Sequence, residues 1–455
     1  MKSIKFKIIF LGLVTIMFLT SGFGCKWTES RIKQTLKPVN LVIWRVWDDE
    51  DTFNDILTAY KQIHPNVTFT YKNLRYEEYE NELLKAWAKD EGPDIFSIPN
   101  AWLRKYQDYI VPLPEKITLS YKETSGFLKK EVKITQKTKK SLSLKDLKSN
   151  FIDVVYDDAV ISDKIYGLPL SVDTLALFYN RDLLNQAQIS EAPQNWNQFI
   201  EAIKKLTVQD YLGNIIQSGA ALGTASNVNR NVDILSCLML QTGTKMEDGN
   251  KVVFDKHSEI YKDYFPGERA LEFYTDFANP SKETYTWNEK MPDSLQAFIE
   301  GKTAFFFGYS YHLLQIQQQA PKLNFDVTLM PQIESSGYKV NYANYWIETA
   351  AKKTKFSNEA WDFIQFAASQ EQADKFLSRA KKPTALRSLI EKQSEDFDLM
   401  SFAKQLLSAK SWYHGKDFNA VEEIFKEMIN QTLKGELSVK DIVKLGVQKV
   451  NQTYK

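Results

Sequence analysis

The sequence has few of the residues from which metal sites and disulfide frameworks are built. Its 455 residues include only two cysteines and four histidines. The histidines, at His64, His257, His312 and His414, do not have the spacing of metal ligands. A formal net charge of +1 gives no electrostatic reason to expect a nucleic-acid partner. We therefore expect no metal, no cofactor and no nucleic acid.

The sequence also lacks the motifs of the common enzyme classes. It contains no Gly-x-Gly-x-x-Gly, Walker loop, His-Glu-x-x-His, paired Cys-x-x-Cys or Gly-x-Ser-x-Gly. The serine in "FFFGYSYHL" follows a strand pattern, but Tyr309 stands before it and no glycine follows closely, which disfavours a nucleophile elbow. Carboxylates are numerous, yet no pattern positions two of them as a glycosidase pair. We predict no catalytic residue.

The N-terminal apolar run is too short to cross a bilayer, because it ends at Leu19 after 12 residues. Lysines precede it and small residues follow it, which is the order of a secretory signal peptide. We predict that residues 1–24 are a signal peptide and residues 25–39 a polar tether. The segment "SGFGC" resembles a bacterial lipobox, with Gly22 where that pattern usually has leucine. The resemblance implies a lipidated Cys25; secretion without lipidation and an uncleaved anchor are the alternatives.

The rest of the chain alternates strand and helix patterns. "LVIWRVW" is typical of a buried strand, residues 53–63 place apolar side chains on one helical face, and residues 67–71 alternate like a second strand. A strand, a helix and a strand in this order predict a parallel sheet with covering helices. The pattern recurs, and the chain is too long for one ordinary core. We predict an α/β protein of two or more lobes.

One segment departs from this pattern. Residues 115–148 contain ten lysines and four acidic residues, with little apolar periodicity. We expect a solvated surface insertion. The alternative is a docking patch for anionic cell-wall or lipid material.

Several segments share an order and a spacing with a known family. They are "LVIWRVW", "EGPDIFSIPNAWL", "KIYGLPLSVDTLALFYNRDLL", "FIEGKTAFFFGYSY" and "NEAWDFIQFAASQEQADKF". Together they resemble the family 1 extracellular solute-binding proteins of bacterial ABC importers, the maltose-binding-protein-like group. The resemblance covers nearly the whole mature chain. It implies an α/β, two-lobe, type II periplasmic-binding-protein-like fold, in which each lobe is a mostly parallel sheet flanked by helices and a hinged cleft lies between them.

The resemblance also implies lobe boundaries and ligand contacts. It places one lobe at 40–170 plus 328–375, with the lysine-rich insertion 115–148 inside it, and the other lobe at 171–327 plus 376–455. The candidate ligand contacts lie in loops at strand ends, at a crossover and before the last helices; they are Trp47, Asp48, Asp49, Asn100, Trp102, Asp173, Tyr309 and Trp412.

These residue types suit an uncharged polyol. Aromatic rings cover the apolar faces of a pyranose, while carboxylates and amides form hydrogen bonds with its hydroxyl groups. An anionic ligand would favour basic groups or helix N-termini, whereas the candidate loops carry mostly acids. For Asp173 the alternative is a structural role, in which it caps a helix or bonds hinge backbone.

We therefore predict an extracytoplasmic, lipid-anchored, monomeric protein that binds a sugar or oligosaccharide by hinge closure and delivers it to an ABC permease. Five alternatives stay open. They are ferric iron held by the phenolates of Tyr309, Tyr311 and Tyr345, a polyamine, an amino acid, a glycan-active enzyme, and a sensor that presents ligand to a membrane kinase.

Overall fold

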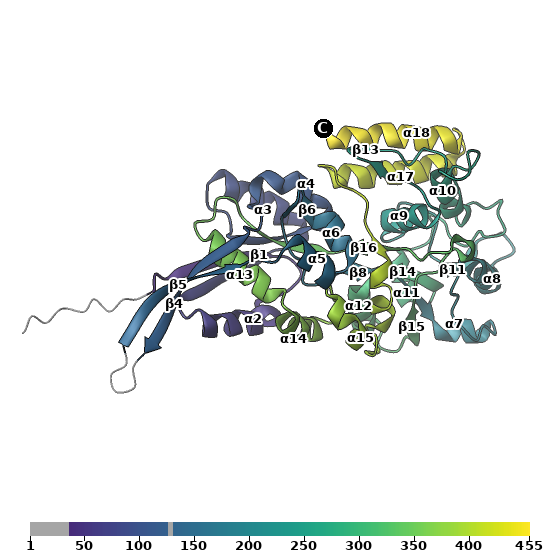
Figure 1. The fold of residues 1–455 in the computed structure, drawn as a ribbon. Helices are drawn as coiled ribbons and strands as arrows, with labels where there is room; N and C mark the ends of the chain where they lie inside the picture. The colour runs from purple at the N-terminus through teal and green to yellow at the C-terminus, as the bar shows by residue number, and fades with distance from the viewer. Residues whose placement is uncertain (1–35, 126–130) are drawn as a thin grey trace, which may run out of the picture. The chain divides into compact units, whose positions relative to one another are not determined.

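The computed structural model describes residues 36–125 and 131–455 (Figure 1). The predicted signal peptide, residues 1–24, and Cys25 lie outside the described residues, so both remain predictions. Within the described part of the chain, no helix is long and apolar enough to cross a membrane.

Contacts divide the described residues into two units. The smaller unit includes Thr118–Lys137, which contains most of the two-stranded sheet formed by β4 (Lys116–Ser125) and β5 (Glu131–Lys140). Within this unit the Lys137 ammonium lies 5.4 Å from the centroid of the Tyr121 ring. The lysine-rich insertion therefore contains a two-stranded sheet that its weak apolar periodicity did not predict.

The larger unit, Val39–Ile117 with Thr138–Lys455, contains two main sheets. The first sheet has the strand order β17-β3-β1-β2. β1 pairs in parallel with β2 and with β3, which confirms the predicted parallel unit, and β17 pairs with β3 in antiparallel orientation. The strands are β1 (Val39–Arg45), β2 (Val67–Asn73), β3 (Ile95–Pro99) and β17 (Trp346–Ala350).

Amphipathic helices pack around the first sheet. The predicted apolar stripe of the first helix is confirmed, since Phe53, Ile56, Leu57 and Tyr60 are all buried. The Asp49 side chain caps this helix by accepting a hydrogen bond from the Thr52 N–H at 2.8 Å. The helices are α2 (Glu50–Ile63), α3 (Tyr76–Ala88), α13 (Ser357–Ala367) and α14 (Gln370–Ala380).

The second sheet has the order β10-β11-β14-β9-β15 and is mixed rather than mostly parallel. Only β11 and β14 pair in parallel, whereas β9 is antiparallel to both β14 and β15. The start of β9, Ala176, pairs with the end of β14, Gly308. The chain therefore enters the second sheet at the edge where β14 ends, so β9 runs antiparallel to β14. The strands are β9 (Ala176–Asn180), β10 (Val208–Gln209), β11 (Ile215–Ala220), β14 (Thr303–Gly308) and β15 (Phe325–Thr328).

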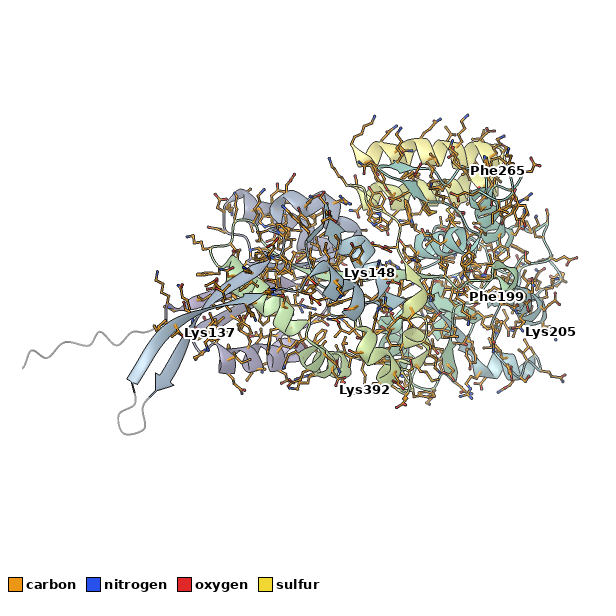
Figure 2. All side chains as sticks on the ribbon, viewed as in Figure 1. Lys137, Lys148, Phe199, Lys205, Phe265 and Lys392 are labelled. Atoms are coloured by element: carbon orange, nitrogen blue, oxygen red, sulfur yellow. The ribbon has the colours of Figure 1, made fainter. Side chains whose placement is uncertain are left out.

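The helices beside the second sheet follow the same principle. In α8, Trp196 and Phe199 are buried as predicted, and Lys205 is exposed; Figure 2 shows Phe199 inside and Lys205 at the outer surface. α17 and α18 lie side by side (Figure 1). The helices are α7 (Arg181–Gln186), α8 (Trp196–Leu206), α9 (Asn231–Gln241), α10 (Pro266–Asp276), α11 (Ser294–Ile299), α12 (Ser310–Gln319), α17 (Phe418–Lys434) and α18 (Val439–Val450).

A small sheet of order β18-β16-β8 joins the segments that run between the two main sheets. β8 (Asp173–Thr174) precedes β9 of the second sheet, and β16 (Asn341–Asn344) connects β15 to β17 of the first sheet. β18 (Ala409–Lys410) precedes α17. The remaining described α-helices and β-strands are α4 (Leu103–Tyr106), α5 (Leu144–Asn150), α6 (Asp153–Ala159), β6 (Val160–Ile161), β7 (Lys164–Ile165), β12 (Glu247–Asp248), β13 (Lys251–Val252), α15 (Arg387–Gln393) and α16 (Met400–Ala403).

Candidate functional site

Four aromatic side chains gather at one edge of the first sheet, and we call them the aromatic cluster: Trp47, Tyr76, Trp102 and Trp346. Trp47, Tyr76 and Trp102 follow the carboxyl ends of the parallel strands β1, β2 and β3. Trp346 begins the antiparallel strand β17 and pairs with Pro99, the end of β3. The topology therefore brings all four to the edge where open α/β sheets bind ligands.

The rings of the aromatic cluster contact one another and leave part of their surface open. Trp47 stacks on Tyr76 with ring centroids 5.7 Å apart, and Tyr76 stacks on Trp102 at 6.4 Å. Trp346 meets the rings of Trp47 and Tyr76 edge-on, at 6.4 Å and 6.1 Å. Trp47 is 64% exposed and Tyr76 39%, whereas Trp102 is only 4% exposed. Exposed aromatic rings stacked above a buried ring, with Trp47 on Tyr76 and Tyr76 on Trp102, are typical of a binding site.

The corresponding edge of the second sheet carries charged and phenolic groups. The Tyr309 hydroxyl donates to the Asp233 carboxylate at 2.7 Å, and the Arg230 Nε donates to the same oxygen at 2.8 Å. The Arg230 guanidinium lies 5.4 Å from the Tyr309 ring centroid. Tyr311, which is 51% exposed, stacks on Tyr309 with centroids 6.0 Å apart. This edge thus presents the exposed ring of Tyr311, stacked on the buried ring of Tyr309, which Asp233 holds in place.

Residues of α17 contact or act on groups at both edges. Phe418, at the start of α17, packs against the apolar core beside each main sheet. One turn later, Glu422 lies close enough to Tyr76 of the first sheet edge for its charge, together with burial, to raise the pKa of that phenol, and the Arg230 charge opposes this rise. Side chains from both sheets therefore share one electrostatic environment.

The acids predicted after the first strand have structural partners. Asp48 is 7% exposed; one carboxylate oxygen accepts from the Arg45 guanidinium at 2.7 Å and the other from the Lys382 ammonium at 2.5 Å. Burial raises the pKa of Asp48, but these two cations outweigh it and lower the pKa. Asp49 caps α2. The predicted ligand contacts of Asp48 and Asp49 gain no support from this geometry, and both stay predictions.

Asp173 also has partners within the protein. One of its carboxylate oxygens accepts from the Ser310 N–H at 2.9 Å and the Ser310 hydroxyl at 2.6 Å, and the other accepts from the Thr174 N–H at 2.9 Å. Ser310 begins α12, so Asp173 satisfies a free N–H at that helix terminus. Burial nevertheless raises the pKa of Asp173 to about 7. This geometry supports the structural alternative for Asp173.

We expect Asp173→Asn to lower the free energy of unfolding by about 1–3 kcal/mol, because one acceptor oxygen becomes an NH2 group that faces N–H and O–H donors. Urea unfolding of this variant, beside the exposed Asp108→Asn control, measures the loss. A stability equal to that of the control, with sugar affinity reduced more than about tenfold, would instead assign Asp173 to the ligand.

The remaining predicted contacts are half-buried or buried. The Asn100 side chain donates to Asp158 at 2.9 Å. Trp412 is 3% exposed, stacks on Phe425 with centroids 5.6 Å apart, and donates to the Ser236 hydroxyl at 3.1 Å. Trp412 therefore lies in the core beside the second sheet, and its predicted ligand contact gains no support.

The iron alternative requires phenolates, which the structure disfavours. The hydroxyl groups of Tyr309 and Tyr345 donate to the carboxylates of Asp233 and Asp158, at 2.7 Å and 2.6 Å. Burial and these carboxylates raise the pKa of both phenols well above the usual value. Within the ranges that the structure describes, no group of three or more His, Cys, Asp or Glu side chains is placed to hold a metal ion.

Sequence reasoning missed five residues at these edges: Tyr76, Arg230, Asp233, Trp346 and Glu422. Tyr76 follows the end of β2, and that position was a usable signal, whereas Trp346 begins β17 and reaches the same edge only through antiparallel pairing. No comparable signal marked Arg230, which precedes α9, or the helical residues Asp233 and Glu422, because only tertiary contacts bring them to these edges.

Comparisons with known proteins identify the family of the chain. The profile of the bacterial extracellular solute-binding proteins matches residues 47–374. A protein of Brucella abortus named as a binding protein is 20% identical over 333 residues, which are 71% of this chain and 70% of that protein. The maltodextrin-binding protein of Bacillus subtilis is 24% identical over 234 residues, 50% of this chain and 51% of that protein.

A solved structure shows the same fold. The cyclic alpha-maltosyl-1,6-maltose binding protein of Arthrobacter globiformis superposes with a TM-score of 0.73 at 18% sequence identity. The superposition covers 92% of this chain and 99% of that protein. The two-lobe type II architecture expected from the sequence is therefore confirmed.

Proposed function

The chain belongs to the family of bacterial extracellular solute-binding proteins, and from that premise we propose that it binds a sugar or oligosaccharide between the two sheet edges and delivers it to an ABC permease. One observation carries the proposal, the open aromatic cluster in which Trp47 is 64% exposed at the carboxyl edge of the first sheet. Relatives that bind maltodextrin and cyclic maltosyl-maltose support the ligand class.

The chemistry of the site suits a saccharide. The faces of Trp47 and Tyr311 can cover the apolar C–H faces of pyranose rings. The Arg230 guanidinium donates through Nε and Nη2 to Asp233, which leaves its Nη1 group to bind a sugar hydroxyl. The Glu422 carboxylate can accept a hydrogen bond from another hydroxyl. These groups come from both sheets, so a ligand that contacts all of them favours the closed arrangement.

We propose that the segments of the sheet β18-β16-β8 form the hinge between two lobes. The first lobe would comprise 40–170 plus 328–375, and the second 171–327 plus 376–455. The last of these boundaries falls inside α14, whose Phe376 packs on Phe53 of α2 with centroids 5.6 Å apart. If the chain instead passes from the first lobe to the second after α15, α14 stays within the first lobe, which fits these contacts better.

Intrinsic tryptophan fluorescence with a panel of neutral oligosaccharides tests the proposed function. We expect saturable binding, and Trp47→Ala should weaken it by about tenfold or more, because an exposed aromatic anchor is removed. Tyr211→Ala is the matched control, since Tyr211 is 95% exposed on the β10–β11 turn. No response to any sugar, or equal losses in both variants, would contradict the proposal.

We also propose an extracytoplasmic location with a lipid on Cys25. The family profile supports export, and "SGFGC" supports lipidation at that cysteine. Mass spectrometry of the N-terminal peptide from bacterial membranes should show a diacylglyceryl mass on Cys25. A free thiol on an uncleaved or differently cleaved chain would contradict lipidation.

A further inference from the structure

Glu422 has an unusual environment among the acidic side chains near the two sheet edges. It lies on the second turn of α17 and is half-buried. Within residues 36–125 and 131–455, no N–H or O–H group donates a hydrogen bond to its carboxylate and no cation forms an ion pair with it. Burial and the nearby Asp233 charge raise the pKa of Glu422. A half-buried carboxylate without a partner is costly, and a cationic ligand would reduce that cost.

Arg230 and Lys426, whose charges act on Glu422, already have carboxylate partners. Arg230 donates to Asp233 through Nε at 2.8 Å and through Nη2. Lys426 donates to Glu423 at 2.7 Å. Each pair is neutral as a whole, so the charge that remains in this group is the single negative charge of Glu422.

Three other acids near the two edges, Asp48, Asp173 and Asp233, have partners within the protein. Asp48 lies between Arg45 and Lys382, and Asp173 accepts from the backbone of Ser310 and Thr174. Among Asp48, Asp173, Asp233 and Glu422, only the Glu422 carboxylate lacks a hydrogen-bond or ion-pair partner within the described residues.

Aromatic faces near Glu422 suit the same cation. Tyr76 lies within electrostatic reach of Glu422, and Trp47 stacks on Tyr76 at 5.7 Å. An ammonium group near these rings would gain a cation–π attraction in addition to the ion pair. An uncharged sugar would contact the aromatic rings and form a hydrogen bond with Glu422, but it would form no ion pair with that carboxylate.

We propose that the ligand is a saccharide that carries a protonated amine, as a hexosamine unit does, with the ammonium group on the Glu422 carboxylate and the sugar ring against the aromatic cluster. This inference rests on the proposed function and specifies its substrate class. A polyamine offers the same ammonium chemistry without the sugar ring, so the test compares the two sources.

Isothermal titration calorimetry with the full chain separates these cases. The probes are the β-1,4-linked disaccharide of glucosamine, its N-acetylated counterpart, a neutral maltodextrin and spermidine. We expect the amine-bearing disaccharide to bind at least about tenfold more tightly than its N-acetylated counterpart. Glu422→Gln should remove this difference. Glu436→Gln, a change of an exposed acid just beyond the end of α17, should preserve it.

Each other outcome overturns a defined part of the inference. Equal or tighter binding of the N-acetylated or neutral sugar, with Glu422→Gln indifferent, would overturn the amine assignment and leave the sugar-binding function intact. Spermidine binding that depends on Glu422, with no saccharide bound, would overturn both the amino-sugar assignment and the proposed function. Binding of no probe would likewise overturn both.

Discussion

Arg45→Met is expected to lower the free energy of unfolding by about 3–5 kcal/mol, because it leaves the buried Glu348 carboxylate without its cation. Arg45 is 5% exposed and donates to Glu348 at 2.6 Å and to Asp48 at 2.7 Å. Asp48 would keep Lys382 as a partner, whereas Glu348 would keep only the Ser97 hydroxyl, at 2.8 Å. The methionine side chain retains apolar contact with Phe53 and Phe376, so the loss reports mainly on the charge.

Two further variants test this interpretation by urea unfolding. Arg379→Met removes an exposed arginine whose pair with Asp55 is 3.4 Å long, and it should change stability by about 0–1 kcal/mol. The double variant Arg45→Met with Glu348→Gln replaces the uncompensated carboxylate by a neutral amide and should recover part of the loss. A double variant as unstable as the sum of its two single variants would contradict the charge argument.

His414→Gln is expected to lower the free energy of unfolding by about 2–4 kcal/mol at neutral pH, with the loss decreasing as the pH rises. His414 lies between two carboxylates: Nδ1 is 2.7 Å from Glu247 and Nε2 is 3.2 Å from Asp158. Burial alone would lower the pKa of His414, but these hydrogen bonds and charges raise it to about 10. The Tyr454 hydroxyl also donates to Glu247.

The sign of the pH dependence follows from the raised pKa of His414. An unfolded histidine has a pKa of about 6.5, so the stabilisation is fully present below that pH. It is lost as the pH rises towards the folded value of about 10. The difference between wild type and His414→Gln should therefore shrink steadily across this interval.

Urea unfolding of both proteins at several pH values between about 6 and 10 measures this difference. His257→Gln is the matched control, since His257 is exposed, and it should follow wild type at every pH. Asp158 keeps hydrogen bonds from Asn100 at 2.9 Å and Tyr345 at 2.6 Å in the variant, so His414→Gln leaves that acid hydrogen-bonded. A difference that is constant with pH would show that the histidine contributes packing rather than charge.

Local patterns predicted the parallel strand–helix–strand unit of the first sheet but not its antiparallel strand β17. The stripe that includes Phe53 and Tyr60 became a buried helix face, and the strand at residues 67–71 pairs in parallel with the first strand. The mixed second sheet was not predicted. Strand direction there depends on where the crossover enters, and side-chain periodicity is the same for parallel and antiparallel strands.

The aromatic cluster shows how far site prediction reached. The family resemblance implied Trp47 and Trp102 as candidate contacts, and both belong to the cluster. Trp346 was missed because it begins a strand, and only the antiparallel pairing of that strand brings this end to the same edge. Trp412 was predicted as a ligand contact but packs on Phe425 in the core.

The sequence alone determined the α/β class, the buried faces of the helices and the family to which the chain belongs, because periodicity and motif order are properties of neighbouring residues. Only the tertiary structure decided which acids are free. Asp48 is engaged by Lys382, 334 positions away along the chain, whereas Glu422 has no such partner among the described residues. The physical reason is that the availability of a carboxylate depends on cations and donors that folding brings from distant parts of the chain.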